Sequence, residues 1–206
     1  MFNFVKLIII YGYILMTEKE KMLSGMIYDA NNDPVLIADR LRCKQLCHRY
    51  NHLEPTDIEN RKELIRNIIG TVDGDFLIEQ PFLCDYGYNI HIGRNFYSNH
   101  NLVILDGAPV SFGDNVFIAP NCGFYTAGHP LEASERNKGL EYARPITVGN
   151  NVWIGANVCV VPGVSIGDNC VIGAGSVVVR DIPPFSVAVG NPCKVIKTLK
   201  QSEYEK

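Results

Sequence analysis

The chain has 206 residues, of which 47% are hydrophobic, and a formal net charge of −3. This is enough apolar sequence for one substantial core or an elongated repeat domain, and there is no basic surplus to neutralise a phosphate backbone, so nucleic acid is not an expected partner. The seven cysteines are odd in number and form no Cys-x-x-Cys pair. They favour a reduced, cytoplasmic protein over a disulfide framework or a structural zinc site, and we expect no bound metal.

The first fifteen residues, MFNFVKLIIIYGYIL, are mostly apolar. The run is shorter than the roughly 20 residues that span a bilayer, and no small-x-small cleavage signature follows it. We therefore interpret residues 1–15 as an extension outside the fold, with a signal anchor as the weaker alternative, and expect no membrane association.

Residues 16–71 predict a helical segment. Asp33, which precedes a proline, is typical of a helix start. One apolar face follows at the i, i+3, i+4, i+7 spacing, formed by Cys43, Leu46, Cys47 and Tyr50. A capping box from Thr56 to Glu59 then predicts a second helix, which Gly70 ends. This pair is too small to fold alone, so we expect it to pack on the domain that follows.

Residues 72–206 predict a β-solenoid. One aliphatic residue recurs every six positions, in Val148, Ile154, Val160, Ile166, Ile172 and Val178. A helix or a single strand does not have this period, whereas a stack of triangular coils does, with three hexapeptides in each coil. Earlier repeats are less regular. The six-residue series that begins at Ile92 is offset by two residues from the series that begins at Phe112, which predicts a small insertion near residues 106–109.

The repeat stops before residue 146. Residues 126–145 are polar and aperiodic, so we expect a loop that leaves the solenoid at one corner. The loop carries His129 between a glycine and a proline. Its imidazole is a candidate general base, because histidine titrates near neutral pH. A rival constellation is a zinc site formed by His91, His100 and His129, although their spacing is not specific.

Several segments together resemble the maltose/galactoside O-acetyltransferase family, most closely its maltose acetyltransferases. They are the hexapeptide run WIGANVCVVPGVSIGDNCVIGAGSVV, the loop motif TAGHP, and the segments RLRCKQLCHRYNH, CDYGYNIHIGRNFYSN and GNPCKVIK. The resemblance runs from about Thr17 to the C-terminus. It implies a mainly β fold, a left-handed parallel β-helix with an N-terminal helical segment and a short C-terminal helix. It also implies a homotrimer whose active sites lie between subunits.

The resemblance implies that the loop of residues 126–145 carries the catalytic base. It implies that His129 takes the proton from a sugar hydroxyl as this oxygen attacks the thioester of acetyl-CoA, the acetyl donor. The main-chain N–H of Ala156 would stabilise the resulting oxyanion. The carboxylate that orients the imidazole is left open among Glu132, Glu135 and Glu141.

The resemblance also implies the binding residues. The acceptor pocket would use Asp29, Asp85 and Asn99, and Asp106 lies beside Gly107, where one family member has a carboxylate. Cofactor contacts would come from Ala156, Ala174, Val179 and Arg180 along the pantetheine groove, and from Lys194 and Lys197 near the adenosine phosphates. The two lysines replace arginines of a galactoside enzyme, which keeps the charge but loses the bidentate geometry.

The sequence therefore predicts an acetyl-CoA-dependent O-acetyltransferase that acts on a sugar such as maltose or glucose. One alternative is another acceptor, such as a galactoside or another saccharide. Less favoured alternatives are a zinc enzyme of the γ-carbonic anhydrase type and a non-catalytic trimeric scaffold.

Overall fold

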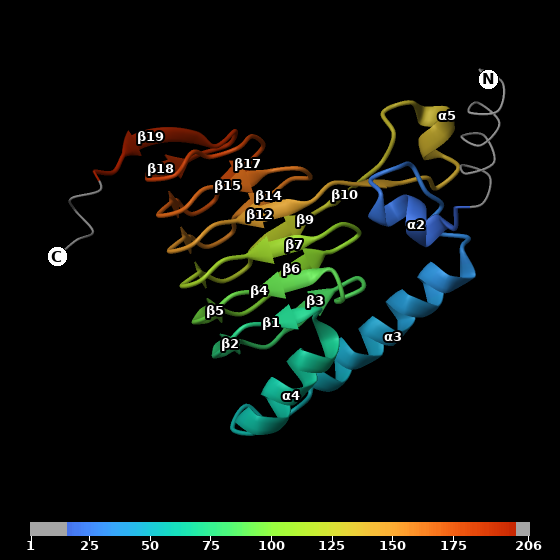
Figure 1. The fold of residues 1–206 in the computed structure, drawn as a ribbon, viewed down its shortest axis with the longest axis horizontal. Helices are drawn as coiled ribbons and strands as arrows, with labels where there is room; N and C mark the ends of the chain where they lie inside the picture. Colours follow the sequence, from blue (N-terminus) through green and yellow to red (C-terminus); the bar gives the residue numbers. More distant parts are fainter. Residues whose placement is uncertain (1–15, 201–206) are drawn as a thin grey trace, which may run out of the picture.

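The computed structural model describes residues 16–200 as a stack of β-coils with helices against its first coil (Figure 1). Three helices come first: α2 (Glu18–Leu23), α3 (Pro34–Asn51) and α4 (Ile58–Ile68). The strands then form three sheets of five, seven and five members. The coils are stacked in chain order, so β18 and β19 lie at the end away from α4 (Figure 1).

Each sheet takes one strand from every coil, and successive strands within it run parallel apart from the final pair. The first sheet contains β1 (Thr71–Val72), β4 (Ile90–Ile92), β7 (Val110–Phe112), β12 (Ile146–Val148) and β15 (Ser165–Ile166). The second contains β2 (Phe76–Ile78), β5 (Phe96–Ser98), β8 (Phe117–Ile118), β13 (Trp153–Ile154), β16 (Val171–Ile172), β18 (Ser186–Val189) and β19 (Lys194–Thr198). The third contains β3 (Phe82–Cys84), β6 (Leu102–Leu105), β9 (Gly123–Tyr125), β14 (Cys159–Val160) and β17 (Val177–Val178).

The six-residue repeat corresponds to the interior of the prism, as predicted. All six repeat positions from 148 to 178 are buried in one continuous core. Val148 pairs with Ile166, one coil of 18 residues later. Ile92 instead pairs with Phe112, 20 residues later, which confirms the predicted two-residue insertion.

Asparagine supplies the tight turns at one corner. Asn95, Asn115, Asn151 and Asn169 all have φ between 55° and 57°, the left-handed region in which asparagine is well tolerated. Their side-chain amides form a ladder, each donating to the next coil at 2.9–3.1 Å. The ladder joins successive coils by hydrogen bonds that complement those between the strands.

The helical segment packs on the first coil through the predicted faces. Cys43, Cys47 and Tyr50 of α3 and Leu64, Ile65 and Ile68 of α4 are buried in the same core as the coils. Asp33 caps α3, as predicted. The cap of α4 lies one residue later than predicted, because the Asp57 carboxylate accepts from the backbone N–H of Asn60 and is a better cap than Thr56.

The expected short C-terminal helix is not formed. Residues Lys194–Thr198 are strand β19, which runs antiparallel to β18. Two physical reasons favour a strand. Val195 and Ile196 are β-branched, and β18 would otherwise expose an unpaired edge at the end of the stack.

The predicted loop 126–145 has its own small structure. A two-residue ribbon pairs β10 (Ala127–Gly128) antiparallel with β11 (Tyr142–Ala143), and α5 (Ala133–Arg136) lies at its far end. The ribbon leaves the prism on the side where α2 lies (Figure 1). The loop is therefore anchored at its root.

Among the described residues, no helix is both long and apolar enough to cross a membrane. The apolar segment 1–15 lies outside the described residues.

The core column through Ile154 gives the first testable prediction. Ile154 is fully buried between Ile118 and Ile172 of neighbouring coils. Ile154→Ala should lower the free energy of unfolding by about 2–5 kcal/mol, because it leaves a cavity that a close-packed core cannot fill. The matched control is Ile196→Ala on β19, where the side chain is 64% exposed and the loss should stay below about 0.5 kcal/mol. Urea unfolding checks both, and equal losses would contradict a core role for the repeat.

Candidate active site

One corner of the prism is wider than the others. Between the third and the first sheet, the chain takes eight residues from Cys84 to Ile92 and eight from Ile104 to Phe112, where a regular turn takes six. The loop 126–145 leaves at the same corner of the next coil, between β9 and β12. The structure thus stacks Asp85, Asp106 and the root of the loop above one another.

Thr126 holds the root of the loop. It is fully buried, its Oγ1 donates to the Leu105 carbonyl at 2.7 Å, and the same oxygen accepts from the Ala108 N–H at 3.0 Å. A Cβ on Gly128 would lie 2.6 Å from the Tyr142 hydroxyl, so a larger residue here would displace the Tyr142 ring that lies against it. His129 follows directly.

The imidazole of His129 is exposed and oriented by the main chain. Its Nδ1 lies 2.9 Å from the Leu140 carbonyl oxygen across the ribbon. A carbonyl can only accept, so Nδ1 carries the proton and donates it. In the neutral ring the unprotonated Nε2 then points away with a free lone pair, the form that a general base requires.

The three carboxylates considered as partners of His129 have other contacts. Glu135 forms an ion pair with Lys138 at 2.7 Å, and Glu132 accepts from Ser134 at 3.5 Å. Glu141 accepts from the Tyr28 hydroxyl at 3.0 Å. No sequence signal could have identified the main-chain carbonyl of Leu140 as the partner of His129, because every residue carries a carbonyl.

Glu141 connects the loop to the N-terminal segment. Its backbone exchanges two hydrogen bonds with Tyr28, at 2.9 and 3.0 Å. Burial and the nearby Glu141 carboxylate raise the pKa of Tyr28, so its hydroxyl stays protonated and donates. Sequence reasoning missed Tyr28 as a neighbour of this site, since the two segments are far apart in the chain.

Asp85 lies at the same corner, half-buried. Burial raises its pKa and Glu141 adds to this, while the cations of Arg40 and Lys44 oppose the shift. Arg40 donates to the Tyr86 hydroxyl at 2.6 Å. The corner therefore holds two carboxylates within electrostatic range of each other, next to two cations from α3.

Asp29 and Asp106 are engaged with the backbone. Asp29 accepts from the backbone N–H groups of Asn31 and Asn32 and from the Asn32 amide, which lowers its pKa. Asp106 is fully buried and accepts from the N–H groups of Asp85, Tyr86 and Asn89. Its carboxylate fixes the backbone that presents Asp85.

Asn99 lies at a different corner, between the second and the third sheet. It lines a surface hollow of about 370 Å³ together with Tyr97, Phe117 and Trp153. Ala156 and Ala174 lie at this same corner in later coils, where the Gly175 N–H donates to the Ala156 carbonyl. A Cβ on Gly155 would lie 2.6 Å from the Ala174 nitrogen, so glycine is needed for this close stacking.

The Ala156 N–H donates to no acceptor within residues 16–200, and the residue is partly exposed. The remaining predicted cofactor residues lie elsewhere. Val179 and Arg180 are exposed just after β17, at the widened corner, and Lys194 and Lys197 are exposed on β19. One chain therefore divides the predicted site residues between two corners and the end of the stack.

Comparison with known proteins identifies the family. Residues 21–74 match the maltose acetyltransferase hexapeptide capping motif, and residues 145–180 match the bacterial transferase hexapeptide with its six repeats. The galactoside O-acetyltransferase of Escherichia coli is 51% identical over 164 residues, 80% of this chain and 81% of that protein. The chain belongs to the maltose/galactoside O-acetyltransferase family.

Solved structures of other acetyltransferases have the same fold. A maltose O-acetyltransferase from Clostridium difficile superposes with a TM-score of 0.88 at 51% identity, over 90% of this chain and 99% of that one. A galactoside acetyltransferase in complex with coenzyme A gives a TM-score of 0.87 at 46% identity, over 93% and 96%. The predicted family is thus confirmed.

The rival zinc site is not brought together within one chain of this acetyltransferase. His91 lies on β4 with its Nδ1 at 2.9 Å from the Thr71 hydroxyl, and His100 lies at the corner of Asn99 with its Nδ1 at 2.6 Å from the Gln80 carbonyl. Among the described residues, no group of histidines and carboxylates lies close enough to share an ion.

Asp106 gives a pH-dependent prediction. Burial raises its pKa from 3.8 to about 6, although the backbone donors of Tyr86 and Asn89 oppose the shift. The folded protein therefore binds this proton more tightly than the unfolded chain. The stabilisation is complete below about pH 4 and is lost as the pH rises through 6, a change of roughly 3 kcal/mol at most.

The measurement is the free energy of unfolding by urea between pH 4 and 8. Asp106→Asn should remove this component of the pH dependence relative to the wild type. The control is Asp114→Asn, a half-buried carboxylate whose pKa is lowered by Arg94, and it should leave the component in place. If the free energy of unfolding of Asp106→Asn changed with pH as that of the wild type does, the assignment of this pH dependence to Asp106 would be wrong.

Proposed function

We propose that this acetyltransferase transfers the acetyl group of acetyl-CoA to a hydroxyl of a sugar such as maltose or glucose, with His129 as the general base. The observation that carries the proposal is the hydrogen bond from His129 Nδ1 to the Leu140 carbonyl. It leaves Nε2 as the only basic atom of an exposed imidazole, at the corner where two carboxylates lie.

The proposed reaction is a direct acyl transfer. His129 Nε2 accepts the hydroxyl proton while the sugar oxygen forms a bond to the thioester carbonyl carbon. The N–H of Ala156 stabilises the negative charge on the carbonyl oxygen. When the carbon–sulfur bond breaks, the proton held by His129 passes to the departing thiolate, so that the products are the sugar ester and the free thiol.

The division of residues between two corners supports a homotrimer with shared sites. Asp85, His129 and Arg180 lie at the widened corner, whereas Asn99, Ala156 and Ala174 lie at the next one. A face of the prism separates the two corners within one chain. We infer that the widened corner of one subunit meets the Asn99 corner of its neighbour, which completes the base, the oxyanion donor and the acceptor pocket.

The acceptor is proposed to be a polyol. Asp85 and Glu141 offer carboxylate oxygens at the corner of His129, and such oxygens are suited to accept from several sugar hydroxyls. The match of residues 21–74 to the maltose acetyltransferase motif supports a maltosyl or glucosyl acceptor. A galactoside is the alternative, supported by the identity to the Escherichia coli enzyme.

Acetyl-CoA is proposed to lie along Ala156, Ala174 and Val179, with Arg180, Lys194 and Lys197 near its phosphates. The coenzyme A bound to the similar galactoside acetyltransferase supports this donor. A cytoplasmic location is proposed as well, since all seven cysteines are free thiols, as a reducing compartment would keep them.

Replacing His129 tests the proposed function directly. His129→Ala should lower kcat by about 10²–10⁴-fold with maltose or glucose as acceptor, because a general base contributes that much. The measurement is thiol release from acetyl-CoA across a panel of maltose, glucose and galactosides. His52→Ala, an exposed histidine at the end of α3, is the control and should retain wild-type turnover. Equal turnover in both variants would refute the role of His129.

The lysines of β19 test the mode of donor binding. Lys197→Ala should raise KM for acetyl-CoA by roughly two- to fivefold and leave kcat unchanged, as expected for an exposed charge pair. With an acetyl donor that lacks the 3′-phosphate, the difference between variant and wild type should shrink. Lys200→Ala, just beyond β19, is the matched control. The same rise in both variants would point to net charge rather than a specific contact.

A further inference from the structure

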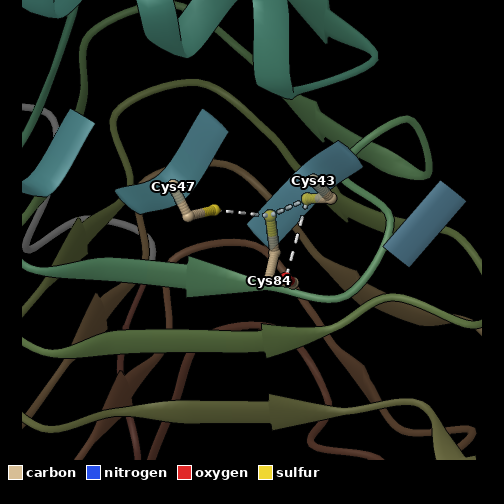
Figure 2. Close-up of side chains that lie close together, drawn as sticks. All are labelled: Cys43, Cys47 and Cys84. Atoms are coloured by element: carbon tan, nitrogen blue, oxygen red, sulfur yellow. Dashed lines mark hydrogen bonds between the residues drawn. The ribbon is translucent and has the colours of Figure 1, made fainter. Parts of the chain in front are cut away.

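Three of the seven cysteines converge between α3 and the third sheet. Cys43 and Cys47 are four residues apart on one face of α3, and Cys84 ends β3. Figure 2 shows the three side chains pointing toward one another. Sγ of Cys84 lies 3.4 Å from that of Cys43 and 3.8 Å from that of Cys47, and all three sulfurs lie within 4.8 Å of one another.

This thiol cluster, Cys43, Cys47 and Cys84, differs from the other buried cysteines. Cys122 and Cys170 each lie singly in the core, with Sγ 3.1 Å from a backbone carbonyl. They fit the expected use of cysteine as a small hydrophobic residue. In the cluster the sulfurs also face one another, although Cys43 Sγ lies 3.6 Å from the Cys84 carbonyl as well, and the residues are only 1%, 1% and 6% exposed.

We propose that the thiol cluster is a binding site for a soft, thiophilic ion held by three sulfur atoms. Ion–sulfur bonds of about 2.3 Å that meet at angles between a pyramid and a plane place the sulfurs roughly 3.4–4.0 Å apart. The two separations from Cys84, 3.4 and 3.8 Å, fall in this range, and the separation of Cys43 and Cys47 is at most 4.8 Å. Soft ions prefer sulfur ligands, and the set contains no nitrogen or oxygen ligand.

The coordination number separates this site from structural zinc. A structural zinc site takes four protein ligands, and among the described residues no fourth cysteine, histidine or carboxylate joins the three. A water molecule would be a poor fourth ligand in a buried core, where it needs several polar partners. The site therefore favours an ion that is stable with only three sulfur ligands.

The net charge of the ion–sulfur complex further restricts the class of ion that fits the thiol cluster. Cys43, Cys47 and Cys84 are all buried, and an unpaired net charge in a low-dielectric interior is costly. An ion whose complex with three sulfurs is neutral thus fits best.

Trivalent arsenic meets this requirement. Arsenous acid, As(OH)₃, reacts with three thiols to give one As(S)₃ unit and three water molecules, so three As–O and three S–H bonds are replaced by three As–S and three O–H bonds. No oxidant or reductant is needed, and the product carries no charge. Copper(I) shares the preference for three sulfurs but leaves a negative complex.

An ion in the thiol cluster would clamp α3 to the end of β3. Cys84 directly precedes Asp85, and α3 also carries Arg40, whose guanidinium binds the Tyr86 hydroxyl. Occupancy would therefore fix the backbone at the widened corner. An effect of the ion on catalysis rests on the proposed acceptor role of Asp85. The ion-binding site in the thiol cluster does not depend on that role.

The test uses the full-length, fully reduced protein under nitrogen, with arsenite as the probe. The wild type should retain one arsenic per chain after gel filtration, and its thermal midpoint should rise with arsenite concentration. X-ray absorption should report three sulfur neighbours and no oxygen. Cys43→Ala, Cys47→Ala and Cys84→Ala should each weaken retention about tenfold or more.

Cys170→Ala is the matched control, since it removes a buried thiol outside the thiol cluster, and it should retain arsenic as the wild type does. The second arm replaces arsenite with copper(I) in competition with bathocuproine disulfonate. Retention of copper(I) without arsenic would keep the three-sulfur site but refute the preference for a neutral complex. The proposal would be overturned if neither probe were retained, if the three variants retained arsenic as well as the wild type does, or if X-ray absorption reported oxygen or nitrogen neighbours.

Discussion

The stacking of each coil on the one before it is the constraint on which the rest of the structure depends. Parallel strands need a partner at a fixed register, and a shift of one residue would turn every inward side chain outward. The aliphatic column through Ile118, Ile154 and Ile172 and the asparagine ladder fix this register from inside and outside the prism. Extra residues can therefore be accommodated only at the corners, where no strand pairing is lost.

The residues added to the regular coils lie at a single corner, and this corner carries Asp85 and the proposed general base. The first two widened turns carry Asp85 and Asp106, and the third becomes the loop with His129. The buried Asp106 lies in the coil between them, where it holds the turn of Asp85 in the preceding coil, while Thr126 holds the root of the loop in the following coil. The solenoid thus determines the backbone positions of the candidate site, and these positions largely fix where its side chains lie.

The sequence predicted what depends on a repeated local pattern. The solenoid, the two-residue insertion and the buried face of α3 all follow from spacing and are confirmed. The C-terminal strand was missed because its pairing depends on the free edge of β18, which the five residues of β19 do not reveal, although two of them are β-branched. The partner of His129 was missed because it is a main-chain carbonyl, and the thiol cluster because Cys84 meets α3 only after the chain has folded back by about 40 residues.

The helix α3 makes the two halves of the molecule depend on each other. Arg40 donates to the Tyr86 hydroxyl and to the Ala30 carbonyl, and less than one turn further on Cys43 faces Cys84, which directly precedes Asp85. Reacting groups must be placed to within about 1 Å for efficient catalysis. His129 is held by its own loop, which is rooted in the coils and paired with Tyr28, whereas the acceptor side of the corner is fixed by α3. The helical segment is therefore more than a cap on the first coil, since it positions one side of the proposed active site.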